Sequence, residues 1–157
     1  MLEHPPTNIL DVADYFLTKE SMTHKKLQKL CYYAQAWYLA NCGRRLFSDY
    51  FEAWVHGPVS PRLYERYRGS GWTPIPKKEN ILLDRTVSSF LDRVYDVYGE
   101  YDGDTLEQIT HREEPWKKAR IGYEPRENCN NIISELDMLS YYKRRIEKDD
   151  GSKEQGS

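Results

Sequence analysis

The chain has 157 residues and a net charge of −2, with 39% hydrophobic and 31% charged residues. This length fits one domain with its own core, and the near-neutral charge gives no overall attraction to nucleic acid or to an anionic membrane. Cys31, Cys42 and Cys129 lack CxxC spacing, which argues against both a zinc site and a disulfide framework. The N-terminus lacks the basic and apolar segments of a signal peptide, and no stretch is long enough to cross a bilayer, so we expect a cytoplasmic protein.

Two helices are predicted in the first part of the chain, over residues 8–19 and 23–41, from apolar residues at helical spacing. The second helix is apolar around most of its circumference, as is typical of a central helix. Gly43 is expected to end it. The clearly polar positions of this helix form one narrow strip, through Lys25, Gln28, Lys29 and Gln35.

Residues 44–59 are predicted to be non-helical, with Gly57-Pro58 forcing a turn. A short helix is predicted over residues 61–68. Pro61 suits its first position, because the missing N–H has no helical partner there, and Ser60 can cap it. A turn this rigid is expected to hold a surface and not only to join two elements.

Three or four further helices are predicted in the rest of the chain. Residues 69–76 form a loop, and a helix follows over 84–98. Asp104 is expected to cap a helix that ends near His111, and Pro115 is expected to break it and begin another through Arg120. The last helix is predicted over 128–148, followed by a disordered tail over 149–157, with these side chains inward: Ile132, Ile133, Leu136, Leu139 and Ile146.

The predicted fold is therefore mainly α. We expect a single compact domain of six or seven helices over residues 1–148, with at most a short β-hairpin or irregular segment near residues 45–59.

Protein binding is the function that the residues favour. Arg and Tyr are common in interface hot spots, and side chains held by an anchored turn lose little freedom on binding. Burial is favoured for the ring of Trp54, although it flanks the turn. The predicted partner-binding residues are Trp54, His56, Arg62, Tyr64, Arg66 and Tyr67.

Two alternatives remain open. A small metal-dependent or His-based hydrolase would use His56, His111, Glu113 and Glu114, although their spacing is not that of HExxH. A nucleic-acid-binding regulator would use basic residues interleaved with aromatic ones, on a helical strip of Lys25, Lys26 and Lys29 and on the helix over 61–68. We predict no catalytic residue, metal or cofactor, and nucleic acid is not favoured as a partner.

Three blocks of residues also carry a family resemblance. They occur in one order between residues 8 and 146, and are Lys26 to Trp37, Glu52 to Val59, and Thr110-His111 with Pro115-Trp116 and Ala119-Arg120. On these blocks the chain resembles the SocA-like antitoxins, the Panacea domain family, which includes the phage-associated GepA-like proteins.

The resemblance implies a mainly helical antitoxin of a toxin–antitoxin system, which neutralises a cognate toxin by direct protein contact and is not an enzyme. In the SocA branch the antitoxin delivers its toxin to a AAA+ protease, so such a protease is a further candidate partner. The two turns typical of the family are expected to pack together and shape one face. They contain the predicted structural residues Gly57, Pro58, His111, Pro115 and Trp116.

Overall fold

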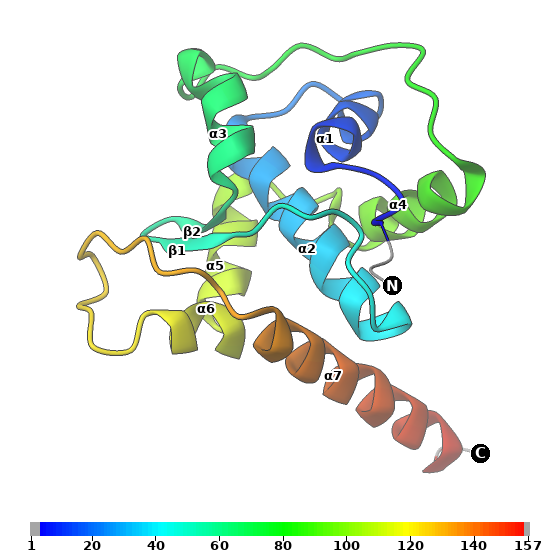
Figure 1. Ribbon diagram of the computed structural model, residues 1–157, viewed down its shortest axis with the longest axis vertical. Coiled ribbons are helices and arrows are strands. Elements are labelled where there is room, and N and C mark those ends of the chain that lie inside the picture. The colour runs from blue at the N-terminus through cyan, green and yellow to red at the C-terminus, as the bar shows by residue number, and fades with distance from the viewer. Residues whose placement is uncertain (1–3, 156–157) are drawn as a thin grey trace.

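The computed structural model describes residues 4–155, and the side chains of residues 4–148. This part of the chain forms seven α-helices, one short 3-10 helix and one two-stranded sheet (Figure 1). The predicted fold class, mainly α in a single domain with a short hairpin, is confirmed. In chain order the elements are α1 (Ile9–Leu17), α2 (His24–Cys42), β1 (Glu52–Trp54), β2 (Gly57–Val59), α3 (Pro61–Tyr67), η1 (Arg68–Ser70), α4 (Arg85–Tyr98), α5 (Gly103–His111), α6 (Glu114–Ala119) and α7 (Glu135–Gln155).

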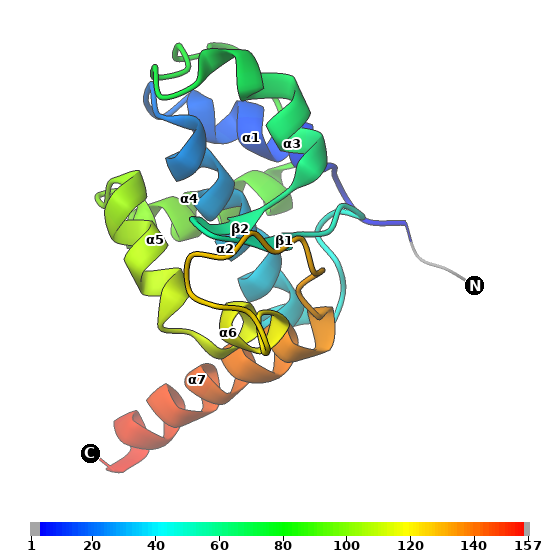
Figure 2. The same ribbon diagram turned by 90° about the vertical axis from the view of Figure 1, so that its left-hand side faces the viewer.

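Helix α2 is the centre of the domain, as its apolar circumference predicts. It contacts α1, α3, α4, α5, α7 and the hairpin, and the two views show these elements surrounding it (Figures 1 and 2). Thr23 caps its beginning by accepting a hydrogen bond from the N–H of Lys26. Gly43 ends it in the left-handed conformation, at φ 68°, which a residue without Cβ adopts at little cost.

The polar strip of α2 is turned into the protein and does not face solvent. The nucleic-acid alternative, by contrast, requires the lysines of this helix to form an exposed basic surface. The side chain of Gln35 is buried, accepts hydrogen bonds from the N–H groups of Leu46 and Phe47 and donates to the carbonyl of Phe47. Gln28 bonds both backbone groups of Ser60 in the same way. These amides satisfy the backbone of the irregular segment before and after the hairpin, because buried polar groups need partners.

The hairpin gains a third extended neighbour from the far end of the chain. Strands β1 and β2 are antiparallel, with Ala53 opposite Pro58. The N–H of Ala53 donates to the carbonyl of Asn131 at 2.9 Å, and the N–H of Ile133 donates to the carbonyl of Phe51 at 2.8 Å. The segment over 128–134 therefore lies along the edge of β1 (Figure 2).

The predicted start of the last helix is therefore wrong, because α7 begins only at Glu135. In the extended segment before it, neighbouring side chains point to opposite sides. Ile133 is buried as predicted, whereas Ile132 is 59% exposed. Leu136, also predicted to point inward, is 75% exposed on the first turn of α7.

Three further helix boundaries can be compared with the prediction. Helix α5 is capped by Asp102, which accepts a hydrogen bond from the N–H of Thr105, so the assignment of Asp104 as cap is wrong. Asp102 has the extended conformation that a cap requires, and Asp104 lies inside the first turn. Pro115 stands at the beginning of α6, as predicted. Helix α7 is continuous to Gln155, across most of the predicted tail; the domain boundary at residue 148 stays a prediction, and residues 156–157 lie outside the described residues.

Candidate protein-binding site

The two turns typical of the family lie against each other. The indole N–H of Trp116 donates to the carbonyl of Trp54 at 2.8 Å. The ring of His111 stacks on that of Trp116 with centroids 4.1 Å apart, and His111 also hydrogen-bonds the backbone of Val55. Trp116 is buried. Side chains of the second turn thus bond the main chain of the first turn and fix its backbone.

Gly57 is required at this turn for two reasons. Its φ of 105° lies in a region that other residues rarely adopt. A Cβ at this position would lie 2.6 Å from Cε of Lys29 and 3.0 Å from Oγ1 of Thr110. The turn therefore closes directly over the side chain of Lys29, with no room for another residue.

Lys29 is a buried lysine without a carboxylate partner. Its side chain is almost completely enclosed, at 1% exposure, and its ammonium donates to the carbonyl of Pro58 at 3.1 Å. Among the described residues no Asp or Glu forms an ion pair with it. Burial lowers the pKa of Lys29 to about 7; Glu107 opposes this shift and the nearby charge of Lys25 adds to it.

Glu107 connects α5 to both the turn and α2. Its Oε1 lies 2.7 Å from Nζ of Lys25 and 3.1 Å from Nδ1 of His56. Burial raises the pKa of Glu107, but the hydrogen bonds from Lys25 and His56 outweigh it, so the pKa is below its usual value. The side chain of His56 is 61% exposed. This contact holds a solvent-facing imidazole in place at the tip of the hairpin.

A cleft of about 340 Å³ opens between α2, the hairpin and α3; we call it the lysine cleft. Basic and aromatic side chains line it, and its lining includes no Asp or Glu. Its lining residues are His24, Lys25, Gln28, Lys29, Trp54, His56, Val59, Tyr64, Arg68, Gly71 and Trp72.

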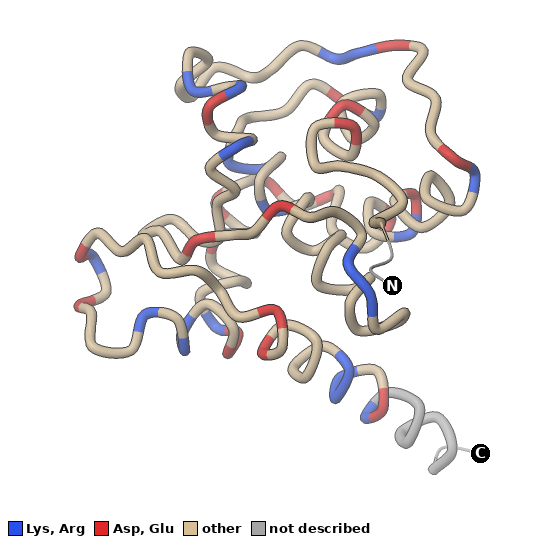
Figure 3. Tube along the Cα trace, in the orientation of Figure 1, with Lys and Arg blue, Asp and Glu red and all other residues tan. Residues whose placement is uncertain are grey.

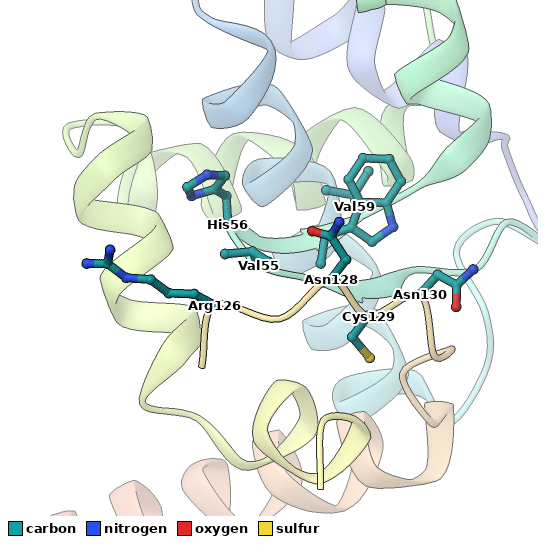
Figure 4. A pocket seen from close by; sticks show the side chains of 8 residues that line it. Val55, His56, Val59, Arg126, Asn128, Cys129 and Asn130 are labelled. Atoms are coloured by element: carbon teal, nitrogen blue, oxygen red, sulfur yellow. The ribbon is translucent and has the colours of Figure 1, made fainter. Parts of the chain in front are cut away.

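A second hollow, of about 720 Å³, lies on the other side of the hairpin; we call it the loop groove. Figure 4 shows the loop that carries Asn128, Cys129 and Asn130 crossing in front of the hairpin, with Arg126 and His56 toward one side. Trp54, His56 and Val59 line both hollows. Residues of the hairpin therefore border both the lysine cleft and the loop groove.

Three of the six predicted partner-binding residues meet at the lysine cleft. Trp54 and Tyr64 pack edge to face with ring centroids 4.9 Å apart, and Tyr64 stacks on the ring of His24 at 5.5 Å. Trp54 is half-buried, so the expected burial of its ring is partly met. His56 also lines the cleft.

The other three predicted residues lie along α3 and do not line the cleft. Arg62 and Arg66 are exposed and lie 3.6 Å from Asp49 and 3.5 Å from Asp14. Tyr67 is half-buried and donates a hydrogen bond to Asp14. Asp14 and Asp49 thus hold these side chains against the domain. Their role in binding stays a prediction.

Trp72 is a candidate binding residue that the sequence prediction missed. It is 73% exposed and lines the cleft from the loop after η1. Its ring lies 6.5 Å from that of His56, and Nζ of Lys25 lies 5.3 Å from its centroid. A tryptophan inside a Gly- and Pro-rich loop was the available signal, because such a loop runs over the surface.

The residues suggested for a hydrolase do not converge. His111 is half-buried and stacks on Trp116, Glu113 bonds Tyr33 and Tyr142 inside the core, and Glu114 pairs with Arg144 on the surface. Within the described part of the chain, no group of three or more His, Cys, Asp or Glu side chains is placed to hold a metal ion.

The lysines suggested for nucleic acid are also engaged elsewhere. Lys26 is buried and bonds Glu20 and the carbonyl of Gly99, and Lys25 pairs with Asp104 and Glu107. Figure 3 shows Lys and Arg interspersed with Asp and Glu along the trace. The lysines of α2 therefore do not form a continuous basic face, which weakens the nucleic-acid alternative.

Fold and site together define a small helical domain with a preformed basic and aromatic cleft, a class of domain suited to binding a partner. The family described as "Antitoxin SocA-like, Panacea domain" matches residues 27–117, which include both turns, and the chain belongs to this family.

The chain is 37% identical over 65 residues to "Antitoxin SocA" of Caulobacter vibrioides (strain NA1000 / CB15N). That match covers 38% of this chain and 35% of the relative, so it spans about a third of the relative's length. No solved structure matches the chain. None of the described helices is long and apolar enough to span a membrane.

Proposed function

We propose that this chain is an antitoxin that neutralises a cognate toxin by direct contact, through the face formed by the hairpin, α3 and Trp72. Membership of the SocA-like antitoxin family supports the class of function. The observation that carries the choice of face is the set of aromatic rings that line the lysine cleft, Trp54, Tyr64 and Trp72, of which Trp54 and Tyr64 pack on each other. Rings held in place before binding lose little entropy in the complex, and large aromatic residues dominate interface hot spots.

The backbone beneath these rings is rigid for identifiable reasons. Trp116 bonds the carbonyl of Trp54, and the hydroxyl of Ser60 caps α3 by accepting from the N–H of Leu63. The turn between them contains Pro58, whose ring fixes φ, after Gly57, which allows the positive φ that the turn needs. Binding through this face would therefore need little rearrangement of the main chain. Delivery of the toxin to a AAA+ protease stays a prediction from the family resemblance.

Replacement of Tyr64 by Ala is expected to weaken toxin binding by about 30-fold, the usual loss at an aromatic hot spot. The toxin to test is the protein encoded by the adjacent reading frame. The measurement combines growth of cells that co-express both proteins with the dissociation constant of the purified pair. Val97→Ala serves as the control, because Val97 is exposed on α4, away from the cleft.

The proposal expects the neighbour to arrest growth alone, the wild-type chain and Val97→Ala to restore growth, and Tyr64→Ala to restore it poorly. A harmless neighbour that does not bind the chain would contradict the antitoxin role. Full rescue and unchanged affinity with Tyr64→Ala would contradict the choice of face.

A further inference from the structure

The lysine cleft contains a buried cation, Lys29, that forms no ion pair with an Asp or Glu of the described residues, although the more distant charge of Glu107 acts on it. A buried ammonium is costly unless hydrogen bonds and an opposite charge surround it. Within the described part of the chain, Lys29 donates one hydrogen bond, to the carbonyl of Pro58, although an ammonium can donate three. The other two cations at the cleft are already paired, Lys25 with Asp104 and Glu107 and Arg68 with Glu65.

The walls of the cleft add a second observation. Trp54, Tyr64 and Trp72 line the cleft, and none of its lining residues is a carboxylate. A group that enters would pass between apolar rings and approach a positive charge in surroundings of low dielectric constant. There an ion pair is stronger than at the open surface. The site therefore complements a negatively charged side chain and not an apolar one.

We propose that the lysine cleft receives an acidic side chain of the toxin, with its carboxylate paired to the ammonium of Lys29. This inference rests on the proposed antitoxin function and names the chemistry of the partner at the same site. The carboxylate supplies the charge and the hydrogen-bond acceptors that Lys29 lacks in the free domain. It thereby offsets the cost of burying the ammonium, and that gain appears only in the complex.

The turn prevents Lys29 from escaping to solvent. Gly57 lies over its side chain so closely that even a Cβ would collide with Cε. The neighbouring Gln28 bonds both backbone groups of Ser60, which fixes the chain that follows the turn. The ammonium is therefore held in place before binding, as a group that recognises a single carboxylate should be.

Binding should also take up protons. The pKa of Lys29 is lowered to about 7, so part of the population is neutral above that pH, and a carboxylate at the cleft would restore the charge. Affinity should therefore fall as pH rises above about 7. The other charged or titratable groups that face Lys29 from the elements around it are His24, Lys25, His56, Arg68, Glu107 and His111.

The test compares Lys29→Met with Lys26→Met, bound to the protein encoded by the adjacent reading frame. Methionine keeps the apolar stem of lysine and removes the charge. Lys29→Met should raise the melting temperature, or leave it unchanged, while weakening binding by about 30-fold or more. Lys26→Met, which breaks a buried pair with Glu20, should lower the melting temperature and leave affinity unchanged. Wild-type affinity in a stable Lys29→Met variant would overturn the inference.

A second measurement separates this inference from the proposed function. The Lys29 side-chain resonances of lysine-labelled wild type are followed by NMR while N-acetylaspartate amide or inorganic phosphate is added. The carboxylate probe should raise the pKa of Lys29, even if the neighbouring protein proves harmless and the antitoxin role fails. A response to phosphate alone, or no response to either probe, would overturn the inference while leaving the antitoxin function standing if the pair binds.

Discussion

Replacement of Arg120 by Met is expected to lower the free energy of unfolding by roughly 3 to 5 kcal/mol, because hydrogen bonds to a charged group contribute about 1.5 to 3 kcal/mol each and water replaces part of them. The buried guanidinium donates to the carbonyl of Ala53 at 2.8 Å and to those of Glu124 and Glu127 at 2.9 and 2.6 Å. It therefore ties β1 to the loop that forms the groove. Urea unfolding followed by tryptophan fluorescence measures the change.

Two controls show whether the fork of hydrogen bonds or the charge is responsible. Arg120→Lys keeps the charge but loses the planar fork, so we expect an intermediate loss. Arg144→Met removes an exposed arginine on α7 that pairs with Glu114, and should change stability little. A Met variant that unfolds at the wild-type urea concentration would show that Arg120 does not hold the loop.

Replacement of Glu113 by Ala is expected to cost a similar amount, about 3 to 5 kcal/mol, because it leaves buried donors without their acceptor. The buried carboxylate accepts hydrogen bonds from Tyr33 at 2.6 Å, Tyr142 at 2.8 Å and Arg145 at 2.8 Å. It thus connects α2 and α7 at the beginning of α6. The neighbouring Glu114→Ala is the control, since that side chain is exposed, and a much smaller loss is expected.

The titration of Glu113 gives the same prediction a pH dependence. Burial raises the pKa of Glu113, and the hydrogen bonds from Tyr33, Tyr142 and Arg145 lower it only in part. Folding therefore favours the neutral carboxyl group, so its contribution falls as pH rises from the ordinary value of 4.5 through the folded-state pKa. Glu113→Gln should lack this fall. Identical pH profiles of stability for wild type and Glu113→Gln would contradict this role of Glu113. Equal losses of stability in Glu113→Ala and Glu114→Ala would contradict it as well.

The helices could be predicted where one apolar face repeats locally. In α4 the predicted inward residues Val87, Phe90, Leu91, Val94 and Tyr98 are all buried. The extended structure of residues 128–134 could not be predicted, because Ile132 and Ile133 fit the apolar pattern of a helix. Their extended form depends on the unpaired edge of β1, which lies far away in the sequence. Long-range pairing of this kind leaves no local signal.

Part of the candidate site could likewise be predicted from the sequence, and part could not. Its turn could be predicted because Gly57, Pro58 and Pro61 have strong local preferences, and it brings Trp54, His56 and Tyr64 to one cleft. Lys29 was named from the sequence only as a basic residue for nucleic acid and not as part of this cleft, because periodicity cannot distinguish a buried lysine from one that faces solvent. Its burial depends on the carbonyl of Pro58 and on the close approach of Gly57.

The proposed function requires that the face around the hairpin and α3 contacts the toxin. Hydrogen–deuterium exchange of the chain alone and in complex with the protein encoded by the adjacent reading frame tests it most directly. We predict slower exchange of backbone amides across residues 52–72 in the complex, with little change in α4. Protection confined to α4 or α7, with unchanged exchange over 52–72, would contradict it.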